Sequence, residues 1–367
     1  MKSNVGVMGW LSLLLAISIF PLWACTGVMV QGQNGTVVTG RTMEFGIDLM
    51  SDIIMIPRGH ITKAILPDGK PGMVWTQRYA AVGFNAWQIP VIEEGVNEKG
   101  LQFGAFLFPG YASYQPLTPG NASRAMTAVY VGTWILGNFA TVDEVKAHMR
   151  DAVVINGNPY NVQFPLPLHF RVIDATGKAI VIEYTDGGKM VIYDNPIGVV
   201  TNAPTFGWHM TNLGNYANLS PINANGYTVN GVQIQSLGQG SGMLGLPGDS
   251  TPPSRFVRMV AVQAASLPVK TSEEAVNLGW TLMNSIAIPK GAIREVKPNG
   301  AEPSDYTQWT AVTDLANRKL YFRNYDNQEI RVVDLMQMPL DSPTILKTPV
   351  STKPEYHDLT AQMKSKR

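Results

Sequence analysis

The sequence of 367 residues contains a single cysteine, Cys25. One cysteine excludes an internal disulfide framework and any zinc site built from several cysteines. The five histidines lie far apart and never form the H-E-x-x-H pattern of a zinc peptidase. We therefore expect no metal and no other cofactor. An unpaired thiol is open to oxidation in a secreted protein, so its presence there needs a reason.

Charged residues are also scarce. They make up 15% of the chain, against about 25% in an average domain. The formal net charge is +1, which gives no reason to expect nucleic acid or an anionic membrane as a partner. The hydrophobic fraction of 45% is ample for a large core.

Two common signatures are missing as well. No G-x-S-x-G motif occurs, so a serine α/β-hydrolase is unsupported. The stretch GSGMLG at 240–245 satisfies the letters of a dinucleotide-binding G-x-G-x-x-G motif. However, LPGD follows at the place where that motif requires a helix, so we do not expect dinucleotide binding.

The sequence has no apolar run long enough for a comfortable membrane span, and the apolar run at the N-terminus is short. Lys2 precedes the stretch VGVMGWLSLLLAISIF, Pro21 ends the run, and Ala24 places a small residue at a candidate cleavage point. This pattern predicts a signal peptide over residues 1–24, cleavage before Cys25, and a periplasmic or secreted protein. An uncleaved anchor helix is the alternative, although the run is too short and interrupted for a comfortable membrane span.

Strand signals dominate the rest of the chain. TGVMVQG and TVVTGRTMEF flank Asn34-Gly35, a strong hairpin signal. Further hairpins are predicted with turns at 97–100, at 176–177, at 187–188 and near Asn317.

Helices are predicted between these hairpins. One covers 122–139, and a second begins after Thr141, where Glu144 completes a capping box. Two more are predicted after the capping residues Ser254 and Ser272. Hairpins in blocks separated by helices predict an α+β fold of antiparallel sheets covered by helices. We expect one domain over 25–345, followed by a basic tail at 346–367.

Cys25 and its nearest charged neighbours form the first candidate site. No charged residue lies between Lys2 and Arg41, so after cleavage the α-amine of Cys25 is the first charge of the chain. The returning strand of the hairpin brings Arg41 and Glu44 back beside that amine. A guanidinium favours the reactive thiolate, an α-amine of ordinary pKa about 8 can shuttle protons, and Glu44 can orient the amine. An ordinary surface pair of Arg41 and Glu44 is the alternative.

Six stretches, in this order, resemble the choloylglycine hydrolase family of N-terminal-nucleophile hydrolases, which comprises bile salt hydrolases and penicillin V acylases. They span nearly the whole chain after Ala24 and read CTGVMV, GRTMEF, GVNEKGL, FPGYASY, TNAPTFGWHMTNLGNY and GLPGDSTPPSRFVR. The resemblance implies an αββα four-layer sandwich, hydrolysis of a small-molecule amide through an acyl-cysteine intermediate, and a homo-oligomer.

The resemblance also implies roles for individual residues. Cys25 resembles the nucleophile, and Arg41 the arginine that supports it. Asn202 resembles the side-chain donor of the oxyanion hole, and Arg255 an arginine that braces the catalytic network. Asn212, in MTNLGNY, is expected to make a second polar contact.

Two positions depart from the family pattern. Glu44 stands where family members commonly carry aspartate, and Leu107 stands where many bile salt hydrolases have asparagine. Only the backbone N–H of Leu107 could donate to an oxyanion. Trp87 and Phe106, together with Phe108 and Tyr111, are candidates for an acyl pocket, although such aromatics more often belong to a core.

These features favour penicillin V as substrate, and N-acyl homoserine lactones as a plausible natural class. Bile salts are the second choice. A rival of another class is a lipidated binding protein, because LWAC nearly fits a lipobox. Lipidation would block the thiol and the amine of Cys25, and it would leave Arg41 and the later motifs unexplained.

Overall fold

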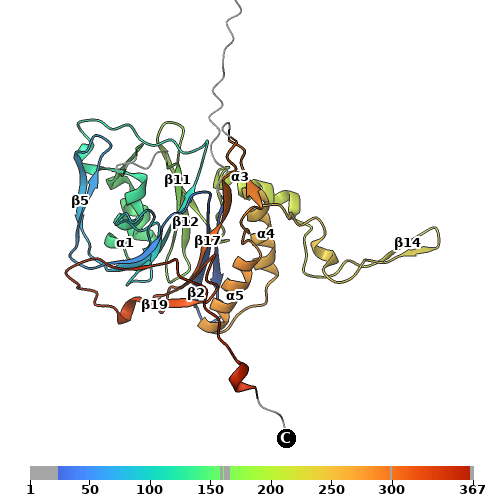
Figure 1. Ribbon diagram of the computed structural model, residues 1–367. Helices are drawn as coiled ribbons and strands as arrows, with labels where there is room; N and C mark the ends of the chain where they lie inside the picture. Colours follow the sequence, from blue (N-terminus) through green and yellow to red (C-terminus); the bar gives the residue numbers. More distant parts are fainter. Residues whose placement is uncertain (1–23, 158–159, 161–165, 298–299, 364–367) are drawn as a thin grey trace, which may run out of the picture.

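The computed structural model describes residues 24–157, 160, 166–297 and 300–363 (Figure 1). The expected signal peptide therefore lies outside the described residues, apart from Ala24. Two antiparallel sheets are stacked face to face, with helices on the outer face of each (Figure 1). Phe84 of one sheet and Trp309 of the other stack with ring centroids 3.9 Å apart. This is the predicted αββα sandwich.

The first sheet has six strands and contains both strands of the hairpin that begins at Cys25. Its strand order is β1-β2-β17-β18-β19, and β16 pairs with β17. The strands are β1 (Cys25–Gln31), β2 (Val37–Phe45), β16 (Ile293–Arg294), β17 (Ser304–Asp314), β18 (Lys319–Asn324) and β19 (Arg331–Asp334). The turn between β1 and β2 contains Gly35 at φ 79°, as the Asn34-Gly35 signal predicts.

The second sheet has eight strands in the order β13-β12-β11-β8-β7-β6-β3-β20. They are β3 (Asp52–Ile56), β6 (Ala81–Phe84), β7 (Glu94–Asn97), β8 (Gln102–Leu107), β11 (Leu168–Ile173), β12 (Ala179–Thr185), β13 (Lys189–Asp194) and β20 (Leu346–Pro349). The turns predicted at 97–100, 176–177 and 187–188 all connect neighbouring strands here. The tail predicted from residue 346 begins with β20, so the sheet extends past the expected domain boundary.

Helices cover the two outer faces. They are α1 (Val131–Asn138), α2 (Val142–His148), α3 (Phe206–Asn212), α4 (Pro252–Ala265) and α5 (Ser272–Asn284). Helix α1 packs on β7 and β8, α4 packs on β1, and α5 packs on β1, β2 and β17. Thr141 caps α2 by accepting from the Glu144 N–H, and the Glu144 carboxylate accepts from the Ala140 N–H. The predicted cap is therefore present, but the reciprocal bond of the capping box goes to Ala140, one residue before the cap.

Three helix predictions need correction. Residues 122–139 do not form one helix, because Ala125–Thr127 forms strand β9 and pairs in parallel with β10 (Val153–Ile155). Short 3-10 helices flank β9, and α1 is the only α-helix of this stretch. Helix α4 is capped at Thr251 rather than Ser254, because the two prolines that follow fit its first turn. Helix α5 is capped by Thr271, one residue before the predicted cap.

Two hairpins stand outside the main sheets. Strands β4 (Ile61–Ile65) and β5 (Pro71–Thr76) pair with each other. Strands β14 (Tyr227–Val229) and β15 (Val232–Ile234) pair at the end of an arm that projects away from the body (Figure 1). Every residue of β14 and β15 is exposed.

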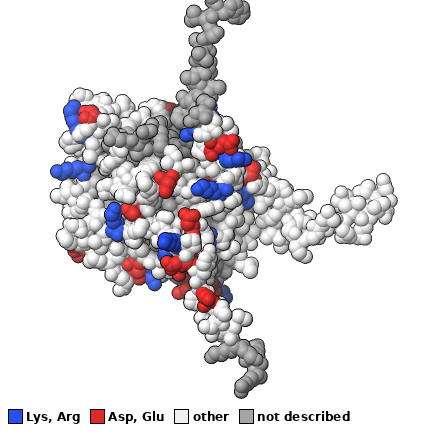
Figure 2. All heavy atoms as spheres, viewed as in Figure 1, with Lys and Arg blue, Asp and Glu red and all other residues white. Residues whose placement is uncertain are grey.

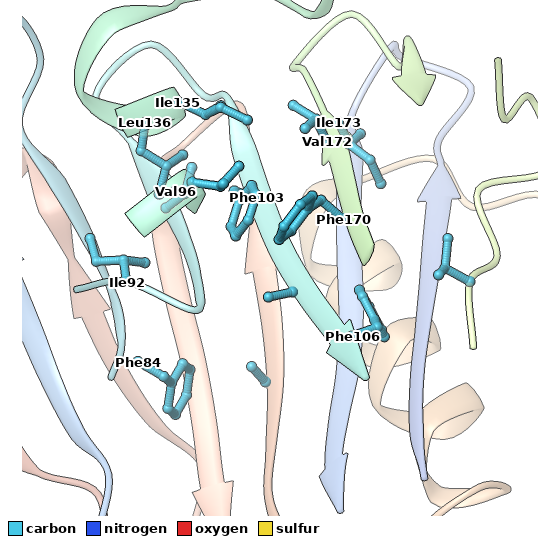
Figure 3. Close-up of a cluster of buried hydrophobic side chains, with 14 of the residues drawn as sticks. Phe84, Ile92, Val96, Phe103, Phe106, Ile135, Leu136, Phe170, Val172 and Ile173 are labelled. Carbon is cyan, nitrogen blue, oxygen red and sulfur yellow. The ribbon is translucent and has the colours of Figure 1, made fainter. Parts of the chain in front are cut away.

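The core between the second sheet and α1 is built from aromatic and branched side chains. Phe103 and Phe170 lie on neighbouring strands with ring centroids 5.6 Å apart, and Ile135 and Leu136 of α1 pack near them (Figure 3). Phe106 extends this cluster toward the space between the two sheets, where the candidate site lies (Figure 3).

Candidate active site

The β1–β2 hairpin places the thiol of Cys25 against a guanidinium. Cys25 pairs with Met43, and Gly27 pairs with Arg41. In this register the side chains of Cys25 and Arg41 both enter the space between the sheets. The Arg41 Nη2 lies 3.8 Å from the Cys25 Sγ, and the Met43 Sδ lies 3.8 Å from the same sulfur. Arg41 therefore lies where the register of the predicted hairpin requires.

Asn202 joins the backbone of Cys25 to the opposite sheet. It follows Val200, which bridges to Gly27 on the open edge of β1. The Asn202 Oδ1 accepts from the Cys25 backbone N–H at 2.7 Å, and its Nδ2 donates to the Leu107 carbonyl at 2.8 Å. Because an amide nitrogen has two hydrogens, one Nδ2–H remains for a further acceptor.

Arg255 ties this amide to the start of β1. From the first turn of α4 it donates to the Cys25 carbonyl at 2.6 Å, to the Thr26 hydroxyl at 2.6 Å and to the Asn202 Oδ1 at 2.8 Å. Burial lowers the pKa of Arg255 to about 10, so it remains a cation at neutral pH. The bracing contacts that the resemblance implies are present in the structure.

Glu44 is buried beside these groups, but it does not bind the Cys25 nitrogen. Its carboxylate accepts from the Thr307 hydroxyl at 2.6 Å and from the Thr42 hydroxyl at 3.1 Å. Burial raises the pKa of Glu44 to about 7, although the nearby Arg255 opposes this shift. Because the Cys25 nitrogen is here in a peptide bond with Ala24 and donates to Asn202, the orientation of the free amine by Glu44 stays a prediction.

Burial and charge act in opposite directions on the thiol. Burial raises the pKa of Cys25, whereas Arg41 lowers it, and burial is the larger effect. The thiol of the resting site therefore keeps its proton until a base accepts it. Burial also lowers the pKa of Arg41, but Cys25 and Glu94 outweigh this and raise it overall.

The four residues predicted to contact substrate lie in different surroundings. Phe106 is fully buried, with the Arg41 guanidinium 4.3 Å from its ring centroid, and its place in an acyl pocket stays a prediction. Leu107 lies beside Asn202 and contributes its carbonyl. Trp87 is partly buried and packs edge-on against Phe45 at 5.8 Å. Asn212 bonds to Asn215 at the end of α3, and no described bond links it to Cys25.

Two residues that contact the candidate site were missed by sequence reasoning. Glu94, at the start of β7, pairs with Arg41 at 3.0 Å and is buried. His209, on α3, donates from Nε2 to the Asn202 carbonyl at 2.9 Å. Both lie in or directly beside stretches that carry the resemblance, but an acid in EEGVNEKGL and a histidine in TFGWHM have no spacing that marks them.

This arrangement is suited to acyl transfer. A thiol, a guanidinium beside it and the buried Asn202 amide bonded to the Cys25 nitrogen bring together a nucleophile and groups that can donate to an oxyanion. Among the described residues, no group of three or more His, Cys, Asp or Glu could hold a metal ion. No described helix is long and apolar enough to cross a membrane.

Comparison with known proteins agrees with this reading. Residues 25–348 match the profile of the linear amide C–N hydrolases, choloylglycine hydrolase family. The chain belongs to the choloylglycine hydrolase family. It is thus an amidase of the linear amide C–N type, and its match begins at Cys25.

Several members of the choloylglycine hydrolase family resemble the chain over most of their length. A bile salt hydrolase/transferase of Clostridium perfringens is 33% identical over 322 residues, covering 86% of this chain and 94% of the relative. The bile salt hydrolase/transferase of Lactiplantibacillus plantarum is 32% identical, covering 91% of this chain and 99% of the relative. A penicillin V acylase of Pectobacterium atrosepticum is 24% identical, covering 92% and 87%.

Solved structures give the same picture. The conjugated bile acid hydrolase of Clostridium perfringens has a TM-score of 0.81 at 30% identity, covering 92% of this chain and 100% of that one. It was solved as a cysteine-to-alanine variant and as an arginine-to-leucine variant, the two positions lying 16 residues apart. A penicillin V acylase of Agrobacterium tumefaciens, at 23% identity and a TM-score of 0.70, shares the fold.

Proposed function

We propose that the chain hydrolyses the amide bond of conjugated bile salts, with Cys25 as its nucleophile. The observation that carries the chemistry is the bond from the Cys25 nitrogen to Asn202, because it places the future α-amine and an oxyanion donor beside one sulfur. The variants of the Clostridium perfringens enzyme support the assignment, since its cysteine and arginine have the same 16-residue separation as Cys25 and Arg41.

Each step of the reaction has a group to perform it. The Cys25 sulfur attacks the amide carbon while its proton passes to the α-amine, which removal of Ala24 sets free. The oxygen that becomes negative accepts from the free Nδ2–H of Asn202, and Arg255 holds that amide in place. The C–N bond then breaks, and the α-amine of Cys25 passes the proton to the leaving amine of the substrate. Water then cleaves the thioester, with the α-amine of Cys25 as base.

The choice of bile salts replaces the preference for penicillin V drawn from Leu107. The bile salt relatives are 28–33% identical to the chain, whereas the penicillin V acylase is 24% identical. Penicillin V remains the second candidate, because Leu107 offers no side-chain amide to a bile salt.

Steady-state kinetics test both parts of this proposal. On the protein that starts at Cys25, glycocholate and taurocholate should give a higher kcat/KM than penicillin V or a long-chain N-acyl homoserine lactone. Cys25→Ala should abolish turnover of all four. Retained turnover in that variant would refute the nucleophile, whereas a preference for penicillin V would leave the nucleophile in place and replace the substrate.

We further propose that the protein is exported, processed at Cys25 and assembled as a homo-oligomer. Support for export comes from the N-terminal signal. Support for assembly comes from the arm, where residues 217–248 carry no charge (Figure 2) and Tyr227 and Val232 are 62% and 60% exposed. An apolar cavity of about 250 Å³ beside α4, lined by Tyr216, Met243 and Val257 among others, offers a surface of the same kind.

A further inference from the structure

A buried carboxylate is shared by two arginines in the space between the sheets. The Glu94 Oε2 lies 3.0 Å from the Arg41 Nη1, and its Oε1 lies 3.5 Å from the Arg171 Nη2. Gln102 also donates to Oε1 at 2.6 Å. All three charged side chains are at most 1% exposed. Arg41 lies against the Cys25 thiol, whereas the proposed reaction assigns nothing to Arg171.

The sequence leaves room for this cluster at two glycines. A Cβ on Gly27 would collide with the Arg171 guanidinium and the Phe106 ring, and one on Gly104 would collide with the Glu94 carboxylate. The ring of Phe106 lies 4.3 Å from the Arg41 Cζ and 5.4 Å from the Arg171 Cζ. The space is therefore shaped for both guanidiniums.

Hydrogen bonding alone does not account for Arg171. Its Nη1 makes two long bonds, to the Val28 carbonyl at 3.3 Å and to the Gly40 carbonyl at 3.4 Å. Among the described residues its Nε and Nη2 have no hydrogen-bond partner. Burying a guanidinium with so few bonds is costly, which indicates an electrostatic role for Arg171. Burial lowers the pKa of Arg171 to about 10, which leaves it charged at neutral pH.

The charges suggest what that role is. Arg41 and Glu94 alone form a neutral pair, and Glu94 then cancels much of the field that Arg41 exerts at the Cys25 sulfur. A second cation on the same carboxylate gives the cluster a net charge of +1. Such a field favours the thiolate and the oxyanion, both of which are negative.

We propose that Arg171 is a positioning residue that offsets Glu94, so that Arg41 presents a net positive charge to the Cys25 thiol. This inference rests on the proposed nucleophile. The other charged groups that face the thiol are Glu44 on β2, Arg255 on α4 and the α-amine, and Glu93 lies near Arg41. None of these is altered in the test.

The test measures alkylation of Cys25 by iodoacetamide against pH, in protein that starts at Cys25. Arg171→Gln should shift the reactivity profile to higher pH and slow alkylation at neutral pH by about three- to ten-fold. Glu94→Gln should shift it to lower pH and speed alkylation by a similar factor. Arg171→Lys, which keeps the charge, should recover most of the wild-type profile.

The pair of opposite shifts separates this role from packing. The proposal is wrong if Arg171→Lys and Arg171→Gln behave alike. It is also wrong if Arg171→Gln and Glu94→Gln shift the alkylation profile in the same direction. Should Arg171→Gln fail to fold, Glu94→Gln and Arg171→Lys still decide the question. Alkylation does not depend on turnover, so these outcomes are distinct from activity of Cys25→Ala, which would refute the nucleophile itself.

Discussion

At the scale of single residues, Asn202 uses one amide group for two tasks. Its Oδ1 accepts from the Cys25 nitrogen and from Arg255, and its Nδ2 keeps one hydrogen free after bonding to the Leu107 carbonyl. The oxygen thus locks the orientation of the nitrogen. The donor is arranged before the oxyanion forms, which is the condition under which such a bond contributes most to rate.

Asn202→Ala should therefore lower kcat far more than it changes KM. Loss of one preorganised oxyanion donor typically costs about 2.7–4 kcal/mol, or about 100- to 1000-fold in kcat. Asn212→Ala is the matched control, because its described bond goes to Asn215 outside the network, and it should retain most activity. Steady-state kinetics check both. An effect of Asn202→Ala on KM alone would make it a binding residue.

His209 makes no described hydrogen bond to Cys25, but it holds Asn202 through a hydrogen bond. Its Nε2 donates to the Asn202 carbonyl at 2.9 Å, and its ring stacks on Phe256, next to Arg255 in sequence, at 4.7 Å. Burial lowers the pKa of His209 from 6.5 to about 4. The folded protein therefore holds His209 neutral over a pH range in which the unfolded chain protonates it. Stability is lost as the pH falls from 6.5 toward 4.

His209→Gln should remove this acid sensitivity while keeping an N–H donor for Asn202. Between pH 7 and pH 5 the wild-type free energy of unfolding should fall by about 1–2 kcal/mol more than that of the variant. Denaturant unfolding at the two pH values measures this difference. His209→Phe removes the donor as well, and its kcat should fall while that of His209→Gln is largely kept. Equal kcat in the two variants would contradict the positioning role.

At the scale of elements, the arm is the clearest feature without a partner within one chain. Tyr227 and Val232 are exposed on a hairpin that no described element covers, and Figure 2 shows no charge on the arm. An exposed apolar hairpin free of charge is typical of a contact surface rather than of a solvated loop.

Val232→Asp should therefore weaken assembly, because it would bury a charge at the contact between copies. Val332→Asp is the matched control, since Val332 is also on a strand and is 53% exposed, against 60% for Val232. Light scattering after size exclusion should give a lower mass for Val232→Asp alone. Unchanged mass in that variant, or a monomeric wild type, would show that the arm does not join copies.

Which elements the sequence could reveal depended on how local their signals are. The hairpin from Cys25 to Phe45 was readable because its turn and both strands are adjacent. The helix predicted over 122–139 was too long, because Ala125–Thr127 pairs with Val153–Ile155, a contact that no local pattern encodes. Asn202 lies 177 residues from Cys25 and Arg255 lies 230 away, so only the family resemblance placed them in one site.

At the scale of the whole molecule, the site is closed by the assembly of two sheets and a helix around the chain start. Cys25 and Arg41 come from the first sheet, Glu94 from the second, and Arg255 from α4. Ala24 is only 4% exposed, and its carbonyl accepts from the Glu44 N–H at 3.1 Å. In the folded chain Ala24 is thus buried and hydrogen-bonded to β2, which would hinder a peptidase at the bond before Cys25. We expect cleavage before the hairpin folds.

Two chains that differ by one residue test this view. A protein whose first residue is Cys25 should be active, whereas one whose first residue is Ala24 should have less than about 1% of that activity. In the second chain the amine lies one residue from the sulfur, and the Ala24 carbonyl stays bonded to the Glu44 N–H, so no base is placed to take the thiol proton. Intact mass must show that Ala24 is retained. Full activity in a chain that keeps Ala24 would mean that a base other than the Cys25 amine accepts the proton.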